Sequence, residues 1–367
     1  MENVVLFGGT FDPIHNGHLR IARAASMFLN ADVVFVPAKN PPGKEPIATP
    51  EQRLSMLRLA LKADGSSSFS ISLFEMKSKE PVNYWVDTVE HFAGKYKHRK
   101  LYFLIGADEV NAFPSWKEPE RICSMATPLY VSRPDIKIED DVLRRFRMMR
   151  LCYDSSGEVS SSAVRSLQSM DIPVPVREFI EQKQLYYFQA ISALISKHRL
   201  IHSVSVARLC YEMSVRNRRP DAGKAYIAGL LHDIGKGTSH AEGKGFMKKA
   251  FPEYADLPEW TYHQFLGAEL ARTRFGIEDE GILDAIRYHA TGKAHMCALG
   301  KMVYSADKTD PLRGYDSAKL IAACMKNYYL GFTDVLRANK EYLLGKGNDL
   351  DNPLTAACMN QYLGEEE

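Results

Sequence analysis

Several common signals are absent from this sequence of 367 residues. None of its six cysteines forms a C-x-x-C pair, which argues against a disulfide framework or a thiolate zinc site and favours reduced thiols in a cytoplasm. No apolar run is long enough to span a membrane, and the first residues lack the basic-then-apolar pattern of a secretion signal. We therefore expect a cytoplasmic protein that does not bind a membrane.

A large excess of charge is also missing, because 47 lysines and arginines nearly balance 45 acidic residues, for a net charge of +2. A broad surface for polyanions is not expected, so nucleic acid is excluded as a main partner. The length suffices for two domains. No internal repeat and no Gly/Ser-rich linker is found, so the domains are expected to abut. The oligomeric state stays open, and a homo-oligomer is compatible with the sequence.

The first half of the chain alternates between short apolar runs and amphipathic segments. The candidate strands are Val4–Phe7, Asp32–Pro37, Phe69–Phe74, Lys100–Gly106, Pro128–Ser132 and Met148–Asp154, and the candidate helices include Leu19–Leu29, Glu51–Lys62 and Tyr84–Tyr96. Such alternation predicts a parallel sheet wrapped by helices, a Rossmann-like α/β fold that binds ligands at the carboxyl ends of its strands.

The pattern changes near Tyr187, where helical periodicity replaces strand alternation. The candidate helices are Leu194–Val215, Lys224–Ile234, Tyr262–Phe275, Ile282–His289, Lys301–Ala306 and Ser317–Lys340. The stretch Gly235–Gly245, rich in glycine and charge, is expected to be a loop. The sequence thus predicts an α/β domain at residues 1–187 and an all-α domain at residues 188–367.

The most informative stretch follows the first apolar run and reads Gly8-Gly9-Thr10-Phe11-Asp12-Pro13-Ile14-His15-Asn16-Gly17-His18-Leu19. It predicts a buried strand, a glycine turn and a helix that begins at or near His18. The two glycines let backbone N–H groups approach a phosphate, and the helix N-terminus adds a positive dipole. His15 and His18 are three residues apart, so on the first helical turn they would share a face and direct two imidazoles at phosphorus.

This stretch resembles the GxFDPxHxGH signature of a nucleotidyltransferase family. Other blocks narrow the resemblance to the bacterial nicotinate mononucleotide adenylyltransferases, over about residues 1–187. These blocks, in chain order, are Asn40–Lys44, Arg53–Leu57, Asn83–Thr88, Gly106–Asp108, Trp116, Arg133–Pro134 and Val159–Arg165.

The resemblance implies transfer of AMP from ATP to nicotinate mononucleotide, with Mg²⁺ on the triphosphate and pyrophosphate as the leaving group. It implies binding of ATP by Gly8, Gly9, Thr10, Phe11, Gly106, Asp108, Ser161 and Ser162, and catalytic positive charge from His15, His18, Lys44 and Arg165. It implies substrate contacts for Arg53, Tyr84, Trp85, Trp116 and Arg133, with Trp116 stacked on the pyridine ring. Trp85 stands where the family usually has threonine, which leaves the choice between acid and amide mononucleotide open.

The all-α half contains a second constellation, formed by His202, His232, Asp233, His263, His289 and Asp307. Histidine and carboxylate side chains suit a transition metal, and no thiolate competes with them. Asp233 has two oxygens and could bridge two metal ions, a pair that activates a hydroxide and clamps a phosphate. Lys236, one turn further along, would neutralise a phosphate oxygen.

The order of these residues resembles that of the HD-domain metal-dependent phosphohydrolases over about residues 190–350, most closely the bacterial type that cleaves diadenosine tetraphosphate to two ADP. The blocks are Arg199–Ser203, Gly229–Lys236, Tyr288–Gly292 and Ala306–Arg313. The resemblance implies one metal held by His202, His232, Asp233 and Asp307, a second held by Asp233, His263 and His289, and phosphates near Lys236 and Arg313. It implies a di-iron centre, while manganese, cobalt and zinc also fit the ligands. Thr309-Asp310 replaces the more usual Ile-Glu and is expected to touch no proposed ligand.

The sequence therefore predicts a bifunctional enzyme, an adenylyltransferase fused to a dinucleoside polyphosphate hydrolase. Two alternatives for the second half stay open. It could hydrolyse another nucleotide, such as a nucleoside triphosphate or a guanosine polyphosphate, or it could be a nucleotide-binding regulatory module without turnover.

Overall fold

The computed structural model describes residues 2–132, 136–153, 159–345 and 352–364. The chain forms two compact units. Unit 1 comprises Met1–Arg165 and Asp171–Lys183, and unit 2 comprises Ser166–Met170 and Gln184–Glu367. Each unit is described by itself.

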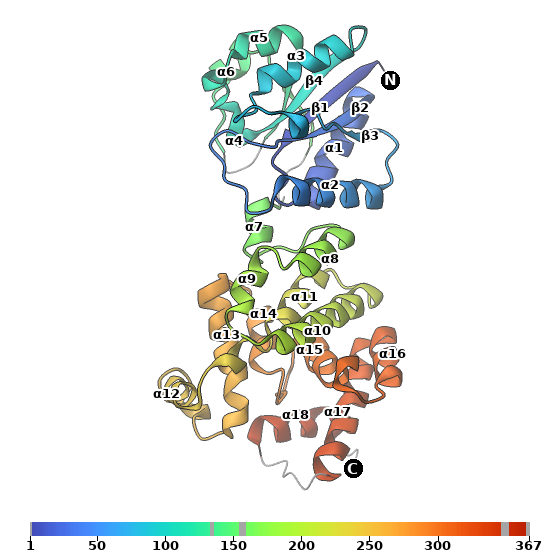
Figure 1. The fold of residues 1–367 in the computed structure, drawn as a ribbon. Helices are drawn as coiled ribbons and strands as arrows, with labels where there is room; N and C mark the ends of the chain where they lie inside the picture. The colour runs from blue at the N-terminus through green and yellow to red at the C-terminus, as the bar shows by residue number, and fades with distance from the viewer. Residues whose placement is uncertain (1, 133–135, 154–158, 346–351, 365–367) are drawn as a thin grey trace. The chain divides into compact units, whose positions relative to one another are not determined.

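Unit 1 is built on a six-stranded sheet in the order β3-β2-β1-β4-β5-β6, with every neighbouring pair parallel. Figure 1 labels β1 to β4 of this sheet. The strands are β1 (Asn3–Gly9), β2 (Ala31–Pro37), β3 (Phe69–Ile71), β4 (Lys100–Gly106), β5 (Thr127–Val131) and β6 (Met149–Arg150). All six predicted strands are confirmed, although β3 and β6 are shorter than predicted. The order of the strands reverses between β1 and β4, which makes the carboxyl ends of these two strands the expected position of a ligand site.

The connections of unit 1 are helical, as predicted. They are α1 (Asn16–Leu29), α2 (Pro50–Asp64), η1 (Glu75–Lys77), α3 (Trp85–Lys95), α4 (Ala107–Val110), η2 (Phe113–Ser115), α5 (Pro119–Met125), α6 (Asp140–Arg145), α7 (Ser161–Arg165) and α8 (Val174–Lys183). The predicted glycine turn after the first strand is wrong, because Gly8 and Gly9 continue β1 and align with Val36 and Pro37 of β2. The core between sheet and helices includes the buried Leu6, Phe92 and Phe103.

The regular elements of unit 2 are all helices in its described residues, in agreement with the predicted all-α half. Its elements are α9 (Tyr187–Ser192), α10 (Lys197–Arg216), α11 (Ala222–Leu231), η3 (Ile234–Gly237), α12 (His240–Ala250), η4 (Pro252–Tyr254), η5 (Glu259–Thr261), α13 (Tyr262–Phe275), α14 (Glu280–Arg287), α15 (Ala298–Thr309), η6 (Pro311–Arg313), α16 (Ala318–Lys326), α17 (Tyr328–Gly345) and α18 (Pro353–Leu363). A Cβ atom on Gly229 would lie 2.8 Å from the Cα of Ala207, so α11 packs on α10 only because this position has no side chain.

Three details of unit 2 differ from prediction. The stretch expected to be a loop contains α12, because Ser239 and Glu242 form a reciprocal capping box that starts a helix. The predicted helix Ser317–Lys340 is two helices, and the side chain of Asn327 at the break accepts backbone N–H groups that begin α17. The unpredicted α18 starts at Asn352, which caps it, and Pro353 in its first turn.

Among the described residues, no helix combines the length and the apolarity needed to cross a bilayer.

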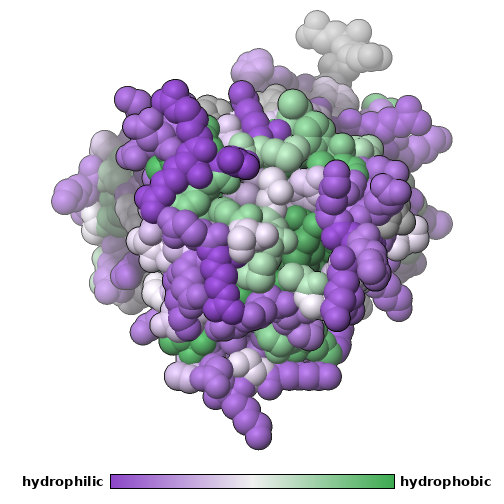
Figure 2. Space-filling model, turned by 90° about the horizontal axis from the view of Figure 1, so that it is seen from above, coloured by the Kyte–Doolittle hydropathy of each residue, from purple (hydrophilic) through white to green (hydrophobic). Residues whose placement is uncertain are grey.

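The face drawn in Figure 2 is mostly hydrophilic, with hydrophobic side chains gathered near its middle.

Candidate functional site

A pair of histidines begins α1 in unit 1. His15 is the N-cap, and its Nδ1 accepts the backbone N–H of His18 at 3.4 Å, while Nδ1 of His18 accepts the backbone N–H of His15 at 3.2 Å. The arrangement is a capping box in which imidazoles replace the usual hydroxyl and carboxylate. The rings stack with centroids 3.6 Å apart. The helix therefore begins two residues earlier than predicted, and one histidine precedes its first turn.

This capping fixes the protonation of both rings. A neutral imidazole whose Nδ1 accepts a hydrogen bond carries its proton on Nε2. Both histidines line a cavity of about 590 Å³. Phe7 and Phe11 pack around His18, with ring centroids 5.9 and 5.2 Å away, and so fix its orientation.

A second cavity of about 420 Å³ adjoins the first, and the two share the ends of β1 and β4. The predicted residues on the larger cavity are Gly8, Gly9, Thr10, Phe11, His15, His18, Lys44, Gly106, Asp108, Ser161, Ser162 and Arg165. Those on the smaller cavity include Tyr84, Trp85 and Trp116. Arg133 lies outside the described residues.

Two hydrogen bonds join the last predicted block of unit 1 to the first. Arg165 donates from Nη1 to the backbone carbonyl of Asp12 at 2.6 Å, and Ser161 donates from Oγ to the carbonyl of Pro13 at 2.9 Å. The Asp12 carboxylate accepts the backbone N–H groups of Ile47 at 2.8 Å and Ala48 at 3.2 Å. The loop after β1 therefore organises segments that lie far apart in the sequence.

The structure corrects the placement of Arg53, which sequence placed at the substrate. The residue is 1% exposed and does not belong to the described lining of either cavity. Its guanidinium donates to the backbone carbonyls of Thr10 at 2.7 Å, Ala38 at 2.6 Å, Lys39 at 3.0 Å and Ala48 at 3.3 Å. These acceptors come from loops at the cavity wall, so the Arg53 guanidinium holds these loops in position through hydrogen bonds.

The smaller cavity also holds a residue that the sequence did not indicate. Glu75 is buried, lines this cavity and accepts a hydrogen bond from Oγ1 of Thr88 at 2.6 Å. Burial raises the pKa of this carboxyl to about 7, against the opposing effect of the Thr88 hydrogen bond. Beside it, the Trp85 ring packs against Gly8, where a Cβ atom would lie 2.5 Å from the ring. Gly8 is therefore required for the close packing of the Trp85 ring on β1.

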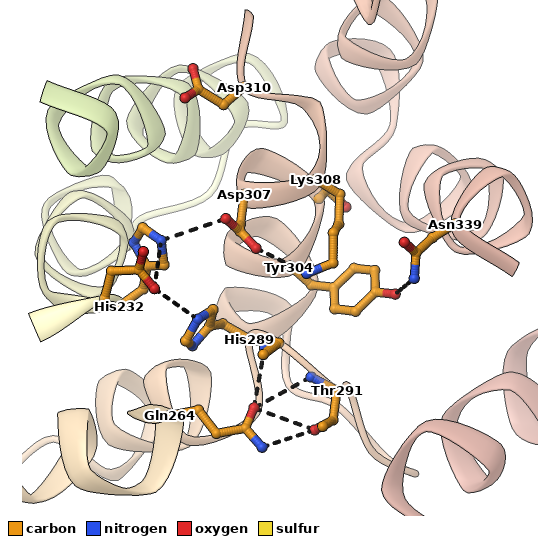
Figure 3. A network of polar contacts seen from close by, with 12 residues as sticks. His232, Gln264, His289, Thr291, Tyr304, Asp307, Lys308, Asp310 and Asn339 are labelled. Atoms are coloured by element: carbon orange, nitrogen blue, oxygen red, sulfur yellow. Dashed lines mark hydrogen bonds and ion pairs between the residues drawn. The ribbon is translucent and has the colours of Figure 1, made fainter. Parts of the chain in front are cut away.

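Unit 2 gathers its predicted histidines and carboxylates in one place. Two groups could hold a metal, one formed by His202, His232 and Asp233, the other by Asp233, His263 and His289. Asp233 belongs to both, as expected of a bridging ligand. Asp307 lies beside the first group, with its Oδ1 at 3.2 Å from Nε2 of His202 and 3.6 Å from Nε2 of His232. Figure 3 shows His232, His289 and Asp307 directed toward one another, the first two from the turns that follow α11 and α14 and the third from α15.

The four imidazoles of this cluster share one orientation. Nδ1 of His232, His263 and His289 lies 2.7, 2.7 and 2.8 Å from the backbone carbonyl three residues earlier. Nδ1 of His202 lies 2.5 Å from a carboxylate oxygen of Asp310. A neutral ring that donates Nδ1–H to an oxygen presents the Nε2 lone pair on its other side, and His202 takes this form once its Nε2 proton is lost, as happens on metal binding. Four Nε2 atoms are thus directed at one centre.

The polar atoms at this centre fit a cation. Nε2 of His232 and Oδ1 of Asp233 are buried, lack a hydrogen-bond partner among the described residues and lie 3.6 Å apart. Burial lowers the pKa of His263 and of His289, so both rings are neutral, yet their Nε2 atoms are only 3.1 Å apart. Two facing lone pairs repel unless a positive ion lies between or beside them. The donor set, imidazole with carboxylate, is that of a transition metal.

The carboxylates of the cluster remain ionised although they are buried. Burial by itself would raise the pKa of Asp233, but its interactions with His232, His289 and the Lys236 ammonium outweigh it and hold the pKa well below the ordinary value. Lys308 and His202 act in the same way on the pKa of Asp307. The predicted cations lie nearby, since Nζ of Lys236 is 2.9 Å from Asp233 and Arg313 pairs with Asp307.

Asp310 corrects an expectation from sequence. The Thr309-Asp310 pair was expected to touch no ligand, but the fully buried Asp310 contacts His202 and accepts Oγ–H of Ser205 at 2.6 Å. Together with Asp307 it raises the pKa of His202 to about 9, against the lowering effect of burial. A carboxylate behind a ligand histidine sets the orientation and basicity of that ligand.

Two further residues near the cluster were not identified from the sequence. Arg199, the first residue of the motif Arg199–Ser203, lies 3.7 Å from Asp233. Gln264 accepts the backbone N–H groups of Ala290 and Thr291 at 3.1 and 3.3 Å and so fixes the chain just after His289 (Figure 3). No motif or spacing in the sequence predicts a role for Gln264.

Comparison with known proteins finds a family match for each half of the chain. Residues 6–167 match a family described as cytidylyltransferase-like, and residues 199–312 match the HD domain. A Mycoplasma genitalium protein named probable nicotinate-nucleotide adenylyltransferase/Ap4A hydrolase is 29% identical over 315 residues, which cover 85% of this chain and 88% of that protein. A Clostridium botulinum protein named probable nicotinate-nucleotide adenylyltransferase is 34% identical over 203 residues, which cover 51% of this chain and 100% of that protein.

Solved structures resemble each part of the chain. A predicted HD superfamily hydrolase involved in NAD metabolism from Clostridium acetobutylicum has 24% identity and a TM-score of 0.44, covering 48% of this chain and 94% of its own. Plasmodium falciparum nicotinic acid mononucleotide adenylyltransferase, complexed with NaAD, has 20% identity and a TM-score of 0.44, covering 51% of this chain and 98% of its own.

Proposed function

Because this chain belongs to the nicotinate-nucleotide adenylyltransferase family through its N-terminal half and carries a C-terminal HD domain, we propose that it is a bifunctional enzyme. Unit 1 transfers AMP from ATP to nicotinate mononucleotide. Unit 2 hydrolyses a dinucleoside polyphosphate, such as diadenosine tetraphosphate, to two nucleoside diphosphates. The names of the Mycoplasma and Clostridium relatives support the first activity in this chain, and the Mycoplasma names support the second.

The observation that carries the first activity is the pair of imidazoles fixed at the start of α1. In the reaction, a phosphate oxygen of the mononucleotide attacks the α-phosphorus of ATP in line, and the bond to the pyrophosphate oxygen breaks. No protein nucleophile is needed, so catalysis depends on position and charge. His15 and His18 donate Nε2–H to the oxygens of the α-phosphate, where negative charge increases. Mg²⁺ bound with ATP would neutralise the triphosphate.

Other residues of the two cavities bind the pyrophosphate, the ribose and the pyridine ring. Lys44 and Arg165 line the larger cavity and offer positive charge to the departing pyrophosphate. Asp108 lies at the carboxyl end of β4, where a ribose hydroxyl can donate to its carboxylate. Trp85 and Trp116 line the smaller cavity and supply flat surfaces for the pyridine ring.

The observation that carries the second activity is the convergence of four imidazole Nε2 atoms on the buried Asp233. Two transition-metal ions, with iron implied by the resemblance, would be held by the two ligand groups and would supply Lewis acidity for cleavage of a phosphoanhydride. Cationic side chains of unit 2 would bind the substrate. Lys236, Arg199 and Arg313 line the adjoining cavity and orient a polyphosphate by pairing with its oxygens.

One experiment tests both activities at once. The intact protein and its His18→Ala and Asp233→Ala variants are assayed for synthesis of the nicotinate dinucleotide and for hydrolysis of diadenosine tetraphosphate. We expect each variant to lose one activity and to keep the other within about twofold. Loss of both activities from either substitution would contradict two independent sites.

The nucleotide hydrolysed by unit 2 is tested with a substrate panel that includes nucleoside triphosphates and guanosine polyphosphates, together with metal analysis. The proposal expects the highest kcat/KM for dinucleoside polyphosphates. Faster turnover of another nucleotide would reassign the substrate. Bound metal without hydrolysis of any nucleotide would make unit 2 a regulatory module.

A further inference from the structure

Two cavities flank the candidate metal centre of unit 2, and they share a positively charged boundary. The larger has a volume of about 910 Å³ and the smaller about 300 Å³. Arg199 and Lys236 line both of them. Each volume is adequate for one end of a small ligand, since ligand pockets range from roughly 300 to 1,000 Å³.

Each cavity contacts a different ligand group. His202 lies on the wall of the larger cavity and His263 on the wall of the smaller. Asp233, which belongs to both groups, lines the larger cavity beside Lys236. A polyanion held by Arg199 and Lys236 would therefore pass the metal centre with one end in each cavity.

Each cavity also offers exposed aromatic rings. Tyr315 and Tyr342 line the larger cavity and are 49% and 62% exposed. Trp260 lines the smaller cavity and is 57% exposed. Exposed rings on the wall of a cationic site are surfaces on which a nucleobase can stack.

We propose that the smaller cavity is a second nucleobase subsite and that Trp260 is its stacking residue. Unit 2 then selects ligands with two base-bearing ends joined by a polyphosphate. The proposal rests on the hydrolase activity proposed above and extends it, because it assigns one end of the substrate to a particular side chain. A ligand with a single base occupies the larger cavity, which has more room and an additional cation in Arg313.

Trp260 has a second role that its substitution does not disturb. Its backbone carbonyl lies 2.7 Å from Nδ1 of His263 and so orients that imidazole. Any other residue at this position keeps the carbonyl, so replacing the indole leaves the metal ligand in place. Trp260→Ala is therefore expected to keep the metal content and the melting temperature of the wild type while it removes the stacking surface.

The test compares wild type with Trp260→Ala, Trp260→Phe and the control Leu330→Ala, which removes an equally exposed apolar side chain of α17 (59% against 57%) that belongs to neither cavity lining. We expect Trp260→Ala to lower kcat/KM for diadenosine tetraphosphate about tenfold, since 1.4 kcal/mol of lost stacking corresponds to a factor of ten. Trp260→Phe retains most of the rate, and Leu330→Ala matches wild type. An unchanged kcat/KM in Trp260→Ala, with metal content retained, would overturn the proposal.

A binding measurement separates this proposal from the hydrolase activity. The difference between the fluorescence of wild type and of Trp260→Phe isolates the emission of Trp260. With a chelator present to prevent turnover, diadenosine tetraphosphate is expected to quench this emission at saturation. If wild type hydrolyses no dinucleotide, the hydrolase activity is refuted, and the quenching alone decides whether the cavity binds a base. Absence of quenching refutes the subsite whatever the hydrolysis assay shows.

Discussion

The two units use the same side chain in opposite ways. In unit 1, Nδ1 of His15 and of His18 accepts a backbone N–H, so the outer nitrogen of each ring is a donor. In unit 2, Nδ1 of His232 and of His289 donates to a backbone carbonyl, so the outer nitrogen offers a lone pair. Donors suit the oxygens of a phosphate, and lone pairs suit a metal ion.

Position along a helix determines which form arises. A helix N-terminus has unpaired N–H groups, and a helix C-terminus has unpaired carbonyls. His15 is the N-cap of α1 and His18 lies in its first turn, where both meet backbone N–H groups. His232 follows directly after α11 and His289 lies just beyond α14, where both meet carbonyls. For these four histidines the exposed nitrogen therefore follows from the end of the helix at which each lies, whereas His263, in the first turn of α13, meets the carbonyl of Trp260 instead.

The comparison predicts its largest effect for substitution of His18, one of the two donor histidines of unit 1. Removing one preorganised donor to a transition-state oxygen typically costs about 10²–10³ in kcat, and we expect that loss of adenylyl transfer in His18→Ala. His18→Gln should recover at least about tenfold, because its amide N–H can replace Nε2–H. Steady-state kinetics with ATP and nicotinate mononucleotide check this. If glutamine restores nothing over alanine, His18 does not act as a hydrogen-bond donor.

The sequence predicts features set by local pattern better than features set by distant contacts. The six strands, the positions of the histidines and their spacing all follow from short-range periodicity and motif order. Arg53 is different, because its carbonyl acceptors come from loops that only the folded chain brings around it. Asp310 meets His202 across 108 residues, and no local pattern encodes that contact. Supporting residues are thus the hardest to predict, since their partners are tertiary.

A smaller effect is expected at Asp310, the one carboxylate that replaces a backbone carbonyl behind a ligand histidine. In Asp310→Asn the amide no longer provides an anion to His202, and loss of such an outer partner typically weakens metal binding about 10- to 100-fold. Titration with a metal-buffered indicator measures the affinity. The control Asp334→Asn makes the same change on α17, where Asp334 pairs only with the exposed Arg337 among the contacts described for it. Equal affinities in the two variants would contradict a role for Asp310.

The buried carboxyls of the two units also differ, in the direction in which their pKa is shifted. In unit 2, neighbouring charges overcome burial and lower the pKa of Asp233 and of Asp307, whereas in unit 1 burial dominates and raises the pKa of Glu75 to about 7. Glu75 therefore keeps its proton in the folded state at pH values where the unfolded chain has lost it. Between the ordinary pKa and about 7 the folded state binds more protons, so stability falls as the pH rises through this window.

Glu75→Gln isolates this contribution, which is the smallest of the three effects. For a pKa of about 7 against an ordinary value of 4.5, linkage predicts that the free energy of unfolding of unit 1 falls by about 2 kcal/mol between pH 5 and pH 7 through this residue alone. The amide mimics the neutral acid and keeps a partner for Thr88, so the variant should lose this pH dependence while it folds normally. Denaturant unfolding at both pH values measures the difference. If the free energy of unfolding changes equally with pH in wild type and in Glu75→Gln, the Glu75 carboxyl is ionised in the folded protein. Burial would then fail to control the pKa of this acid in unit 1, as it fails to control the pKa of the acids in unit 2.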